Sequence, residues 1–523
     1  NRLVLSVIVC SLVVLAGCGG SSYNGSTPPP TGSFSNSDLN GTYVFSAVGS
    51  NSSGVFFALV GTLAANGSGG ITGGTLDLND PTLGVFPGLV ISSGTYKVTT
   101  DGRGTAALNT SQGSIGLAFV LSSSSHGLVT RYDTNGTGSG TLDLQSTVTQ
   151  SQIAGSYAFN FTGISSLNTT TGAQPTLATV GAFTLDASGN MTSGVEDFNN
   201  NGSSIGLTSL ALSGSVSLAT VPGVATITTS AGTLNFDVYP VDATHLKLVE
   251  VDAAPIMVGD AFTQTSSIPT GANVFSLAGF DTVAQGPFTA AGIMVTDGNG
   301  NVTAGSEDIN DAFVASTVPN FTGSYSAASG GRSVLTLAGF NNGANGILCT
   351  SCQFAAYPSS GGLQLLEIDS AGSTNGIAYR QTPTALASAQ GYGLNLTGVN
   401  AGNGTGAFEE DDIAEFTNTS GSFAGLIDYN DQGSLNPDQR FSATYAADAT
   451  INGRGTIASS SFNLVSYSVD SSTTVFVEVD TTQLGLGSFG LQTPTAKSNI
   501  AAMHLAALHL RMGAKSALRR NRN

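Results

Sequence analysis

Gly41-Thr42-Tyr43-Val44-Phe45 is the first copy of a string that recurs three more times along the chain. The later copies are Gly155-Ser156-Tyr157-Ala158-Phe159, Gly271-Ala272-Asn273-Val274-Phe275 and Tyr392-Gly393-Leu394-Asn395-Leu396. Aromatic and branched residues next to a glycine are typical of a β-strand at a turn. The copies are about 115 residues apart, and a constant spacing of this kind indicates a repeated structural unit. We therefore predict four copies of one unit in this chain of 523 residues.

Other strings recur at matching places in the units. An acidic string follows the second strand of each unit: Leu76-Asp77-Leu78-Asn79, Glu196-Asp197-Phe198-Asn199, Glu307-Asp308-Ile309-Asn310 and Ile427-Asp428-Tyr429-Asn430. Each unit ends near a glutamine: Gln145, Gln264, Gln381 and Gln492. An arginine follows a mid-unit glycine in three units, whereas the second unit has Gly223-Val224 there.

The first unit alternates short apolar runs with turns rich in Gly, Asn, Ser and Asp. The runs cover residues 43–48, 56–63, 71–78, 95–99, 105–108, 115–121, 128–132 and 141–144. About eight short strands with no helical period predict an all-β fold. Sequential antiparallel strands of this number can close into an up-and-down barrel, which removes exposed edges. A two-sheet sandwich is the alternative.

These patterns divide the chain into seven segments. We predict a signal peptide at 1–17, a flexible Gly/Ser/Pro linker at 18–37, β repeats at 38–146, 152–265, 270–382 and 388–493, and a basic tail at 494–523.

The repeats resemble the calycin superfamily, in particular its avidin- and lipocalin-like barrels. The shared features are a Gly-x-Tyr opening strand, a second strand that ends in a glycine-containing turn, and a third strand led by small residues. The family usually has Trp where this chain has Tyr43 or Tyr157. The resemblance implies a barrel in each repeat and a small ligand in the barrel mouth, an implication that fails if bulky residues fill the barrels.

The predicted β body is strongly acidic. The chain has a formal net charge of −18, and only eight basic residues lie between Leu39 and Ala496. These are Lys97, Arg103, Arg131, Lys247, Arg332, Arg380, Arg440 and Arg454. We expect no nucleic-acid partner, because binding to the phosphate backbone requires clustered Lys and Arg.

The N-terminal residues are typical of an export signal. Arg2 precedes an apolar run from Leu3 to Leu15, which is too short to span a membrane. Leu15-Ala16-Gly17-Cys18 resembles the lipobox of bacterial lipoproteins, in which processing exposes the cysteine and attaches lipid such as palmitate to it. The resemblance implies a membrane anchor at Cys18, and Gly19 in place of an aspartate implies the outer membrane. An ordinary secretory signal is the alternative.

The C-terminal residues differ from the body. Ile500, Met503, Ala507 and Leu508 follow a helical spacing, and the segment ends in several arginines. We expect either a short basic amphipathic helix, which could lie on anionic lipid, or a frayed tail.

Asp297, Asn299 and Asn301 place oxygen atoms at alternate positions, as a Ca²⁺ loop does. Val302 stands where an EF-hand loop needs Gly, and Asp308 stands where it needs a bidentate Glu. We therefore keep a weak calcium site as a candidate beside the structural interpretation, a hairpin turn in which Asp297 accepts backbone hydrogen bonds.

Recurring charged residues form a second candidate site. Arg103, Arg332 and Arg454 suit bidentate contact with a carboxylate, and we expect the late-strand residues Glu367 and Glu478 to be the partners. Glu250 stands at the same place in the second unit, which lacks the arginine. The alternative is that these charged residues belong to a ligand site. Each glutamate lies two residues before an aspartate on the same strand face. Paired acids are what glycosidases use, although two acids on one strand do not straddle a glycosidic bond.

Cys349 and Cys352 are predicted to form a local disulfide, because the protein is expected to be exported. Gln353 and Phe354, which follow, align with a strand of the second unit, so the helix that a redox motif needs is not expected.

Repetition of one domain without a catalytic constellation favours multivalent binding. The histidines lack metal-ligand spacing, and no Gly-x-Ser-x-Gly string has plausible partners. We expect a non-enzymatic, lipid-anchored protein of the cell envelope that needs no cofactor and binds a glycan or protein ligand or acts in adhesion. The alternatives are a structural spacer and a carbohydrate-active hydrolase that uses the late-strand carboxylates.

The anchoring prediction is tested by Cys18→Ser. We expect this substitution to move the protein from the membrane fraction to the soluble fraction and to abolish labelling by a fatty-acid precursor, because the thiol is the predicted lipid attachment point. Unchanged labelling of the variant would contradict the prediction.

Overall fold

The computed structural model describes residues 33–382, 385–402 and 407–494. Cys18, the predicted signal peptide and the basic tail beyond Pro494 lie outside these residues. Among the described residues, no helix is both long enough and apolar enough to cross a membrane.

Repeat 1 consists of a short 3-10 turn and nine strands. Its elements are η1 (Asn36–Asp38), β1 (Asn40–Asn51), β2 (Phe56–Asn66), β3 (Gly70–Asp80), β4 (Gly84–Ile91), β5 (Ser93–Val98), β6 (Arg103–Thr110), β7 (Gly113–Ser123), β8 (His126–Asp133) and β9 (Gly136–Leu144). Strand β4 is additional to the predicted runs, because Pro87 and Gly88 interrupt its alternation.

Repeat 2 has the same plan with a shorter fourth strand. Its elements are η2 (Gln150–Ile153), β10 (Gly155–Ile164), β11 (Thr176–Leu185), β12 (Met191–Asn200), β13 (Leu210–Ala211), β14 (Ser213–Ser217), β15 (Gly223–Thr229), β16 (Gly232–Asp242), β17 (His245–Glu250) and β18 (Ile256–Thr263).

Repeats 3 and 4 each have eight strands, because one long strand replaces the fourth and fifth. Repeat 3 comprises β19 (Gly271–Asp281), β20 (Gly286–Thr296), β21 (Asn301–Asp311), β22 (Val314–Tyr325), β23 (Ser333–Ala338), η3 (Ala344–Gly346), β24 (Cys352–Ser359), β25 (Gly362–Glu367) and β26 (Gly372–Arg380). Repeat 4 comprises β27 (Gln390–Asn400), β28 (Phe408–Thr419), β29 (Ser422–Asp431), β30 (Ser434–Ala447), β31 (Arg454–Ala458), β32 (Asn463–Ser468), β33 (Thr473–Glu478) and β34 (Gln483–Leu491).

All four sheets are antiparallel, and the barrel rather than the sandwich is the architecture present. Repeats 3 and 4 are closed barrels in which the first strand pairs with the last. In repeat 1 the pairing of β2 with β3 closes the sheet, and β4 lies beside β3. In repeat 2 the sheet ends at β13 and β14, near which a single bridge joins Asn190 to Ser215. The predicted all-β fold of four tandem barrels is therefore confirmed.

A glycine in the second strand allows an aromatic ring to fill the barrel. Phe159 pairs in register with Gly181, and a Cβ on Gly181 would lie 2.4 Å from Cζ of Phe159. Repeat 3 repeats this arrangement, with Gly292 at 2.5 Å from Cζ of Phe275. The ring thus packs directly on the neighbouring backbone, which any larger residue at the glycine would prevent.

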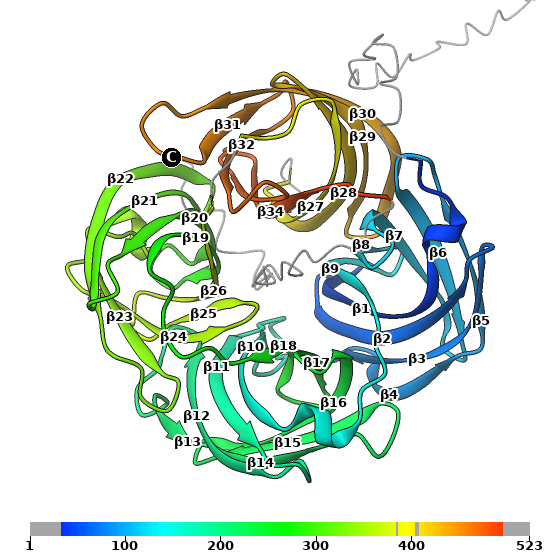
Figure 1. Ribbon diagram of the computed structural model, residues 1–523, viewed down its shortest axis with the longest axis horizontal. Helices are drawn as coiled ribbons and strands as arrows, with labels where there is room; N and C mark the ends of the chain where they lie inside the picture. Colours follow the sequence, from blue (N-terminus) through cyan, green and yellow to red (C-terminus); the bar gives the residue numbers. More distant parts are fainter. Residues whose placement is uncertain (1–32, 383–384, 403–406, 495–523) are drawn as a thin grey trace, which may run out of the picture.

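The four barrels form a ring, in which repeat 4 lies beside repeat 1 (Figure 1). We call the contact of each repeat with the next a junction: 1–2, 2–3, 3–4 and 4–1. The same backbone hydrogen bond forms at every junction, from the residue after the terminal glutamine to a carbonyl of the next repeat. The bonds are Ser146 N to Val241 O at 2.8 Å, Thr265 N to Pro358 O at 3.0 Å, Thr382 N to Val469 O at 2.7 Å and Thr493 N to Ser122 O at 2.7 Å.

The asparagine of each acidic string binds the late hairpin of the next repeat. Nδ2 of Asn79 donates to the carbonyls of Glu250 and Asp252 at 2.8 and 2.9 Å. Asn199, Asn310 and Asn430 make equivalent bonds, and Asn430 closes the ring by donating to the carbonyls of Arg131 and Gly136 at 3.0 and 2.9 Å. One amide thus donates to at least two backbone carbonyls of the next repeat.

Apolar clusters also cross the junctions. Val60 of repeat 1 packs with Val258 of repeat 2, and Val274 of repeat 3 packs in a cluster with Val475 of repeat 4. The cluster at junction 4–1 is the smallest of these, with Val120, Leu128 and Ile413. Because neighbouring repeats share buried apolar surface, we expect each repeat to stabilise the next.

The terminal glutamines test this coupling. Nε2 of Gln492 donates to the buried carbonyls of Asp101 and Leu121 at 2.8 and 2.9 Å, whereas Nε2 of Gln264 has no partner. We expect Gln492→Ala to lower the free energy of unfolding by about 1–3 kcal/mol, since it leaves both carbonyls unsatisfied. Gln264→Ala is the matched control and should cost less; denaturant unfolding measures both. Equal losses would contradict the assigned role.

Candidate functional site

Bulky side chains fill the barrel interiors, so a ligand in the barrel mouth is not expected. Tyr43, Phe45, Phe57 and Phe119 are buried in repeat 1, and Tyr157, Phe159 and Phe161 are buried in repeat 2. Phe159 stacks on Phe161 with ring centroids 4.6 Å apart. The calycin-like ligand site implied by the sequence therefore finds no support in the packing, although the barrels themselves are present.

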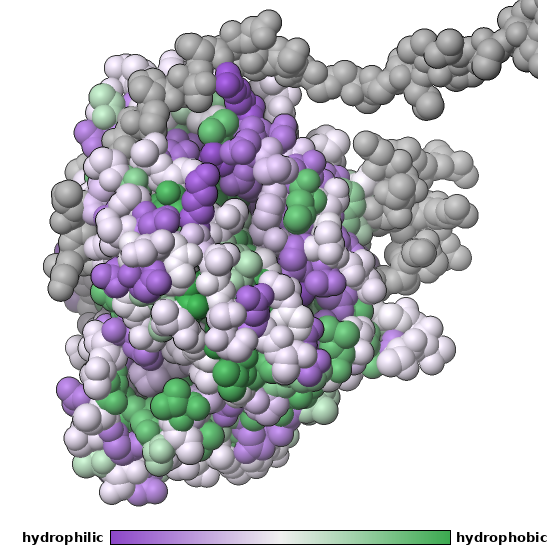
Figure 2. All heavy atoms as spheres, turned by 90° about the vertical axis from the view of Figure 1, so that its right-hand side faces the viewer, coloured by the Kyte–Doolittle hydropathy of each residue, from purple (hydrophilic) through white to green (hydrophobic). Residues whose placement is uncertain are grey.

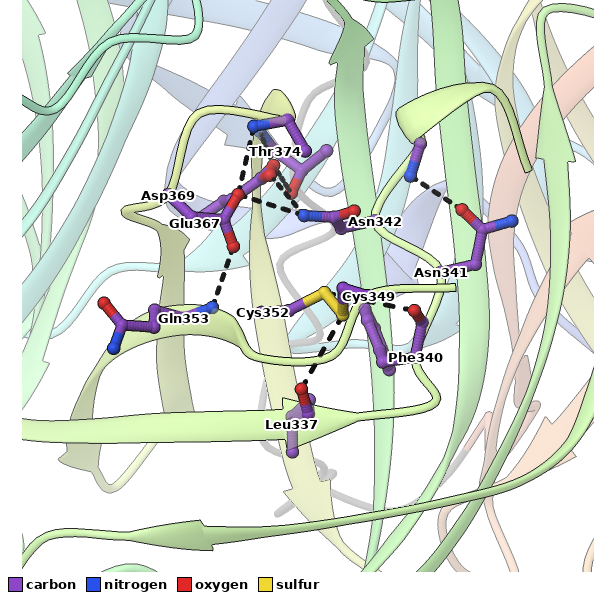
Figure 3. Close-up of a disulfide and its surroundings, with 12 residues drawn as sticks. Leu337, Phe340, Asn341, Asn342, Cys349, Cys352, Gln353, Glu367, Asp369 and Thr374 are labelled. Carbon is purple, nitrogen blue, oxygen red and sulfur yellow. Dashed lines mark hydrogen bonds between the residues drawn. A yellow bond between two sulfur atoms is a disulfide. The ribbon is translucent and has the colours of Figure 1, made fainter. Parts of the chain in front are cut away.

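In repeat 3 the loop that holds the cysteines carries amide groups to two buried glutamates. Cys349 and Cys352 are joined by a disulfide at the end of this loop (Figure 3). Nδ2 of Asn342 donates to Oε1 of Glu367 at 2.8 Å and to Asp369 at 3.0 Å, and the backbone N of Asn341 donates to Glu307 at 2.7 Å. The disulfide thus belongs to a structural loop, with strand β24 after it rather than a helix.

A cavity lies where the four repeats meet, on the inside of the ring. It has a volume of about 90 Å³ and is lined by residues of every repeat. Ser46, Thr162, Gln364 and Thr397 are one representative from each repeat in order. The volume suffices for several water molecules. We call it the axial cavity.

Side-chain amides join neighbouring repeats in the wall of the axial cavity. Nδ2 of Asn375 donates to Oδ1 of Asn160 at 2.7 Å, across junction 2–3. Nδ2 of Asn395 donates to Oγ1 of Thr130 at 3.2 Å and to Oγ of Ser139 at 3.0 Å, across junction 4–1. The wall therefore carries amide and hydroxyl groups in fixed positions, next to apolar residues such as Val48, Val258 and Ile377.

One side of the axial cavity bears an ionic cluster at junction 1–2. Nζ of Lys247 lies 3.1 Å from Asp260 and 3.8 Å from Asp143. His245 contacts Asp260 at 2.7 Å, and His126 contacts Asp143 at 2.7 Å. Burial opposes ionisation of Asp143, but the adjacent His126 and Lys247 outweigh it and hold the pKa of this carboxyl below its usual range. Lys247, which is 1% exposed, is thus paired with two aspartates.

The recurrent arginines have partners different from those expected. Arg332 makes a bidentate pair with Asp197 of the preceding repeat, at 2.7 Å for both bonds, and Arg454 does the same with Asp308 at 2.7 and 2.8 Å. Arg103 bonds to Asp428 at 2.8 Å and so pairs repeat 1 with repeat 4. The expected pairing with Glu367 and Glu478 is absent from these contacts, because each arginine crosses a junction.

The late-strand glutamates are buried instead at the barrel ends. Glu367 accepts hydrogen bonds from Asn342 and Thr374, whereas both carboxyl oxygens of Glu250 and Oε2 of Glu478 have no partner. Burial, and then the nearby Asp252, raise the pKa of Glu250 to about 9. A buried carboxyl without donors is held in its neutral form, so these groups are poor candidates for contact with a polysaccharide.

The candidate calcium loop is built as a hairpin turn. Oδ1 of Asp297 accepts the backbone N–H groups of Asn299 and Asn301 at 2.7 and 3.0 Å, and Oδ2 accepts Nδ2 of Asn301 at 2.7 Å. Asp186 makes the same turn in repeat 2. Within the described residues no group of three or more His, Cys, Asp or Glu side chains is arranged to hold a metal ion.

The axial cavity was not predictable from motifs. Lys247 is one of few basic residues in the body, and its burial could not be inferred without the ring. His126 and His245 begin the equivalent strands β8 and β17. This correspondence was the sequence signal available for the ionic cluster.

Comparisons with known proteins place the chain in no family. No protein-family model matches the sequence, and no curated protein matches it. Among solved structures, a Trp-176-Ala mutant of Transferrin Binding Protein B from Haemophilus parasuis Hp5 matches 72% of this chain and 83% of its own, with 9% identity and a TM-score of 0.18. Intact Ap-TbpB matches 70% of this chain and 83% of its own, with 11% identity and a TM-score of 0.15. These TM-scores are too low for either match to bear on fold or function.

The arginine contacts give a stability prediction. We expect Arg454→Ala to lower the free energy of unfolding by about 3 kcal/mol, because it leaves Asp308 buried without its counter-charge. Val224→Ala, at the start of β15 in repeat 2, is the control. Val224 is 48% exposed, so the expected change is within about 0.5 kcal/mol. Denaturant unfolding decides, and an unchanged midpoint for Arg454→Ala would refute the structural role.

The buried carboxyls give a pH prediction. Burial is the main cause that raises the pKa of Glu196 to about 8 and that of Glu250 to about 9. In the unfolded chain both ionise near their ordinary pKa, so between about pH 5 and pH 9 the folded state binds more protons and its stability falls as pH rises. We expect the thermal midpoint to decrease over this range and Glu250→Gln to flatten the decrease. A midpoint that rises with pH would contradict this.

Proposed function

We propose that this chain is a lipid-anchored binding protein of the bacterial cell envelope and that its ligand site is the axial cavity. The observation that carries the proposal is that all four repeats contribute side chains to this one cavity. Four barrels that bound ligands separately would need four open mouths, whereas here the interiors are filled by aromatic rings.

The cavity wall limits the ligand. Hydroxyl and amide groups from Ser46, Thr162, Asn160 and Thr397 favour a small ligand that both donates and accepts hydrogen bonds, such as a polyol or one terminal sugar unit. Lys247 and Asp260 supply one positive and one negative charge at the wall. A large apolar ligand is disfavoured, because burying these groups without partners would cost free energy.

The proposal assigns no catalytic step to the chain. Glycoside hydrolysis would need two accessible carboxyl groups on opposite sides of a bound sugar. Glu250, Glu367 and Glu478 are each at most 1% exposed and point into barrel ends. A structural spacer remains the second candidate, and the filled barrel interiors are the observation in its favour.

The proposal for localisation and partners is based on the sequence. We propose that lipid on Cys18 holds the ring at the outer membrane and that the Gly/Ser/Pro segment 18–37 gives it reach. A glycan or protein of the envelope would then present the group that enters the axial cavity.

The experiment is a ligand screen on the full chain with Cys18→Ser to keep it soluble. Monosaccharides and polyols are tested by thermal shift, and hits are titrated by calorimetry. For a true ligand we expect Thr162→Val to weaken binding roughly five- to tenfold, because it removes one hydroxyl without changing side-chain shape. Thr105→Val, at an exposed position of β6, is the matched control. If no compound binds, or both variants bind alike, the axial site is refuted and the spacer function is favoured.

A further inference from the structure

Three junctions of the ring share one ionic arrangement. The aspartate of the acidic string accepts a guanidinium from the next repeat, as Asp197 does from Arg332 and Asp308 from Arg454. A tyrosine completes two of these sites: the hydroxyl of Tyr357 donates to Asp197 at 2.5 Å, and that of Tyr467 donates to Asp308. At junction 4–1, Asp428 accepts Arg103. The aspartate thus has a cation as its partner at each of these three places.

Junction 1–2 keeps the acceptors and lacks the arginine. In repeat 4, Arg454 pairs in register with Tyr467. The residue of repeat 2 that corresponds to Tyr467 is Tyr239. Because Gly223 pairs with Val238, Pro222 lies opposite Tyr239, at the position of the arginine. Asp77 is the acceptor; its Oδ1 receives the backbone N–H of Gly88, as Oδ1 of Asp197 receives that of Ser209. No cation pairs with the other oxygen of Asp77, Oδ2, whose neighbours are the carboxyl of Asp237 and the hydroxyl of Tyr239. Asp77 and Tyr239 are each 1% exposed.

A second acid at this junction, Asp237, raises the free-energy cost of ionising Asp77 without a cation nearby. Asp237 of β16 has no acidic counterpart in the other repeats, where Ala118, Ala355 and Val465 stand in register. Burial, and then the nearby Asp237, raise the pKa of Asp77 to about 7, and burial also raises the pKa of Asp237. Two carboxyls in this position cannot both ionise without a counter-charge, so the pair retains a proton when no cation is present.

The surface around this junction is suited to a protein partner. Val90 of β4 is 59% exposed, and Val221 and Val224, on either side of Pro222, are 80% and 48% exposed. Hydrophobic side chains gather on the lower part of the face shown in Figure 2, which looks at the outer side of repeat 1. At the sister junctions the arginine side chains remain 14–17% exposed, so the guanidinium position opens toward solvent. Exposed apolar residues beside an acid that lacks a cation partner are typical of an interaction site.

We propose that junction 1–2 is a binding site for an arginine side chain of a partner protein. The guanidinium takes the position that Arg332 and Arg454 occupy at the sister junctions, accepted by Asp77 and flanked by Asp237 and Tyr239. The proton shared by the two carboxyls leaves to solvent as the guanidinium enters, so one positive charge replaces another. Gly88 and Pro222 lie close together at this position, since a Cβ on Gly88 would be 3.9 Å from Cδ of Pro222. These two residues must therefore move apart to admit the guanidinium. This site is separate from the axial cavity and does not depend on its function.

The probe is N-acetylarginine amide, titrated into the full chain with Cys18→Ser and followed by NMR or calorimetry. N-acetylcitrulline amide, which has the same shape without the charge, is the control ligand. We expect only the arginine probe to bind, and to bind at least about tenfold more weakly near pH 5.5 than near pH 8, because the pair must first lose its proton. Binding of both probes, or of neither, would overturn the proposal.

Variants locate the site and keep the test independent of folding. Asp77→Asn should abolish probe binding. Pro222→Arg supplies the missing guanidinium from within the chain, so it should raise the thermal midpoint relative to Pro222→Gln and also abolish probe binding. Binding that survives Asp77→Asn or Pro222→Arg would overturn the assignment.

A last comparison distinguishes a protein partner from a free cation. A tripeptide with arginine between two leucines should bind more tightly than the arginine probe, and Val224→Ser should remove this advantage without affecting the probe. A tripeptide that binds no better than the probe would overturn the assignment of a protein partner.

Discussion

The amide of one asparagine per repeat is the contact on which the ring depends. At each late hairpin, backbone carbonyls accept hydrogen bonds from the asparagine of the acidic string in the preceding repeat. A hydrogen bond of this kind is directional, so it fixes the rotation between neighbours as well as holding them together. Because the donor of repeat 4 meets the acceptors of repeat 1, the head-to-tail contact closes.

The four junctions reach similar geometry with different chemistry. Junctions 1–2 and 3–4 bury large apolar clusters, whereas the cluster at junction 4–1 has only three residues. That last junction is richer in polar contacts: Arg103 bonds to three aspartates, and Ser139 donates to Asp411 at 2.6 Å. Burial of apolar surface is insensitive to direction, but charged hydrogen bonds are not. The closing contact therefore depends on geometry set by the other three.

The strands and the repeats were predictable from the sequence because both are periodic. Tyr43, Tyr157 and Tyr392 recur at the same strand position, and alternation placed most strands of repeat 1. Partners across junctions were not predictable. Arg454 and Glu478 belong to one repeat and align with their counterparts, yet the guanidinium reaches Asp308 of the preceding repeat. An internal alignment shows which residues correspond, but not which neighbour each one meets.

The axial cavity was hidden from the sequence for a related reason. Its wall takes one or a few side chains from each repeat, so no short segment contains a recognisable site. Lys247 and Asn160 of repeat 2 correspond to Leu128 and Ser46 of repeat 1. Nothing in a single repeat marks these residues as part of a cavity. The chemistry of the axial cavity wall therefore comes from divergence between the copies rather than from their identity.

Closure also sets how many copies the gene can hold. A linear array of repeats can gain or lose a unit by recombination, because each unit meets only its neighbours and the ends are free. Here both faces of every repeat are occupied, and the backbone bond from Thr493 to Ser122 uses the last pair. A fifth unit would have no place to dock, and a chain of three would leave two unmatched faces. We therefore expect that this protein cannot change length by duplication or deletion of a unit, the usual routes in repeat proteins.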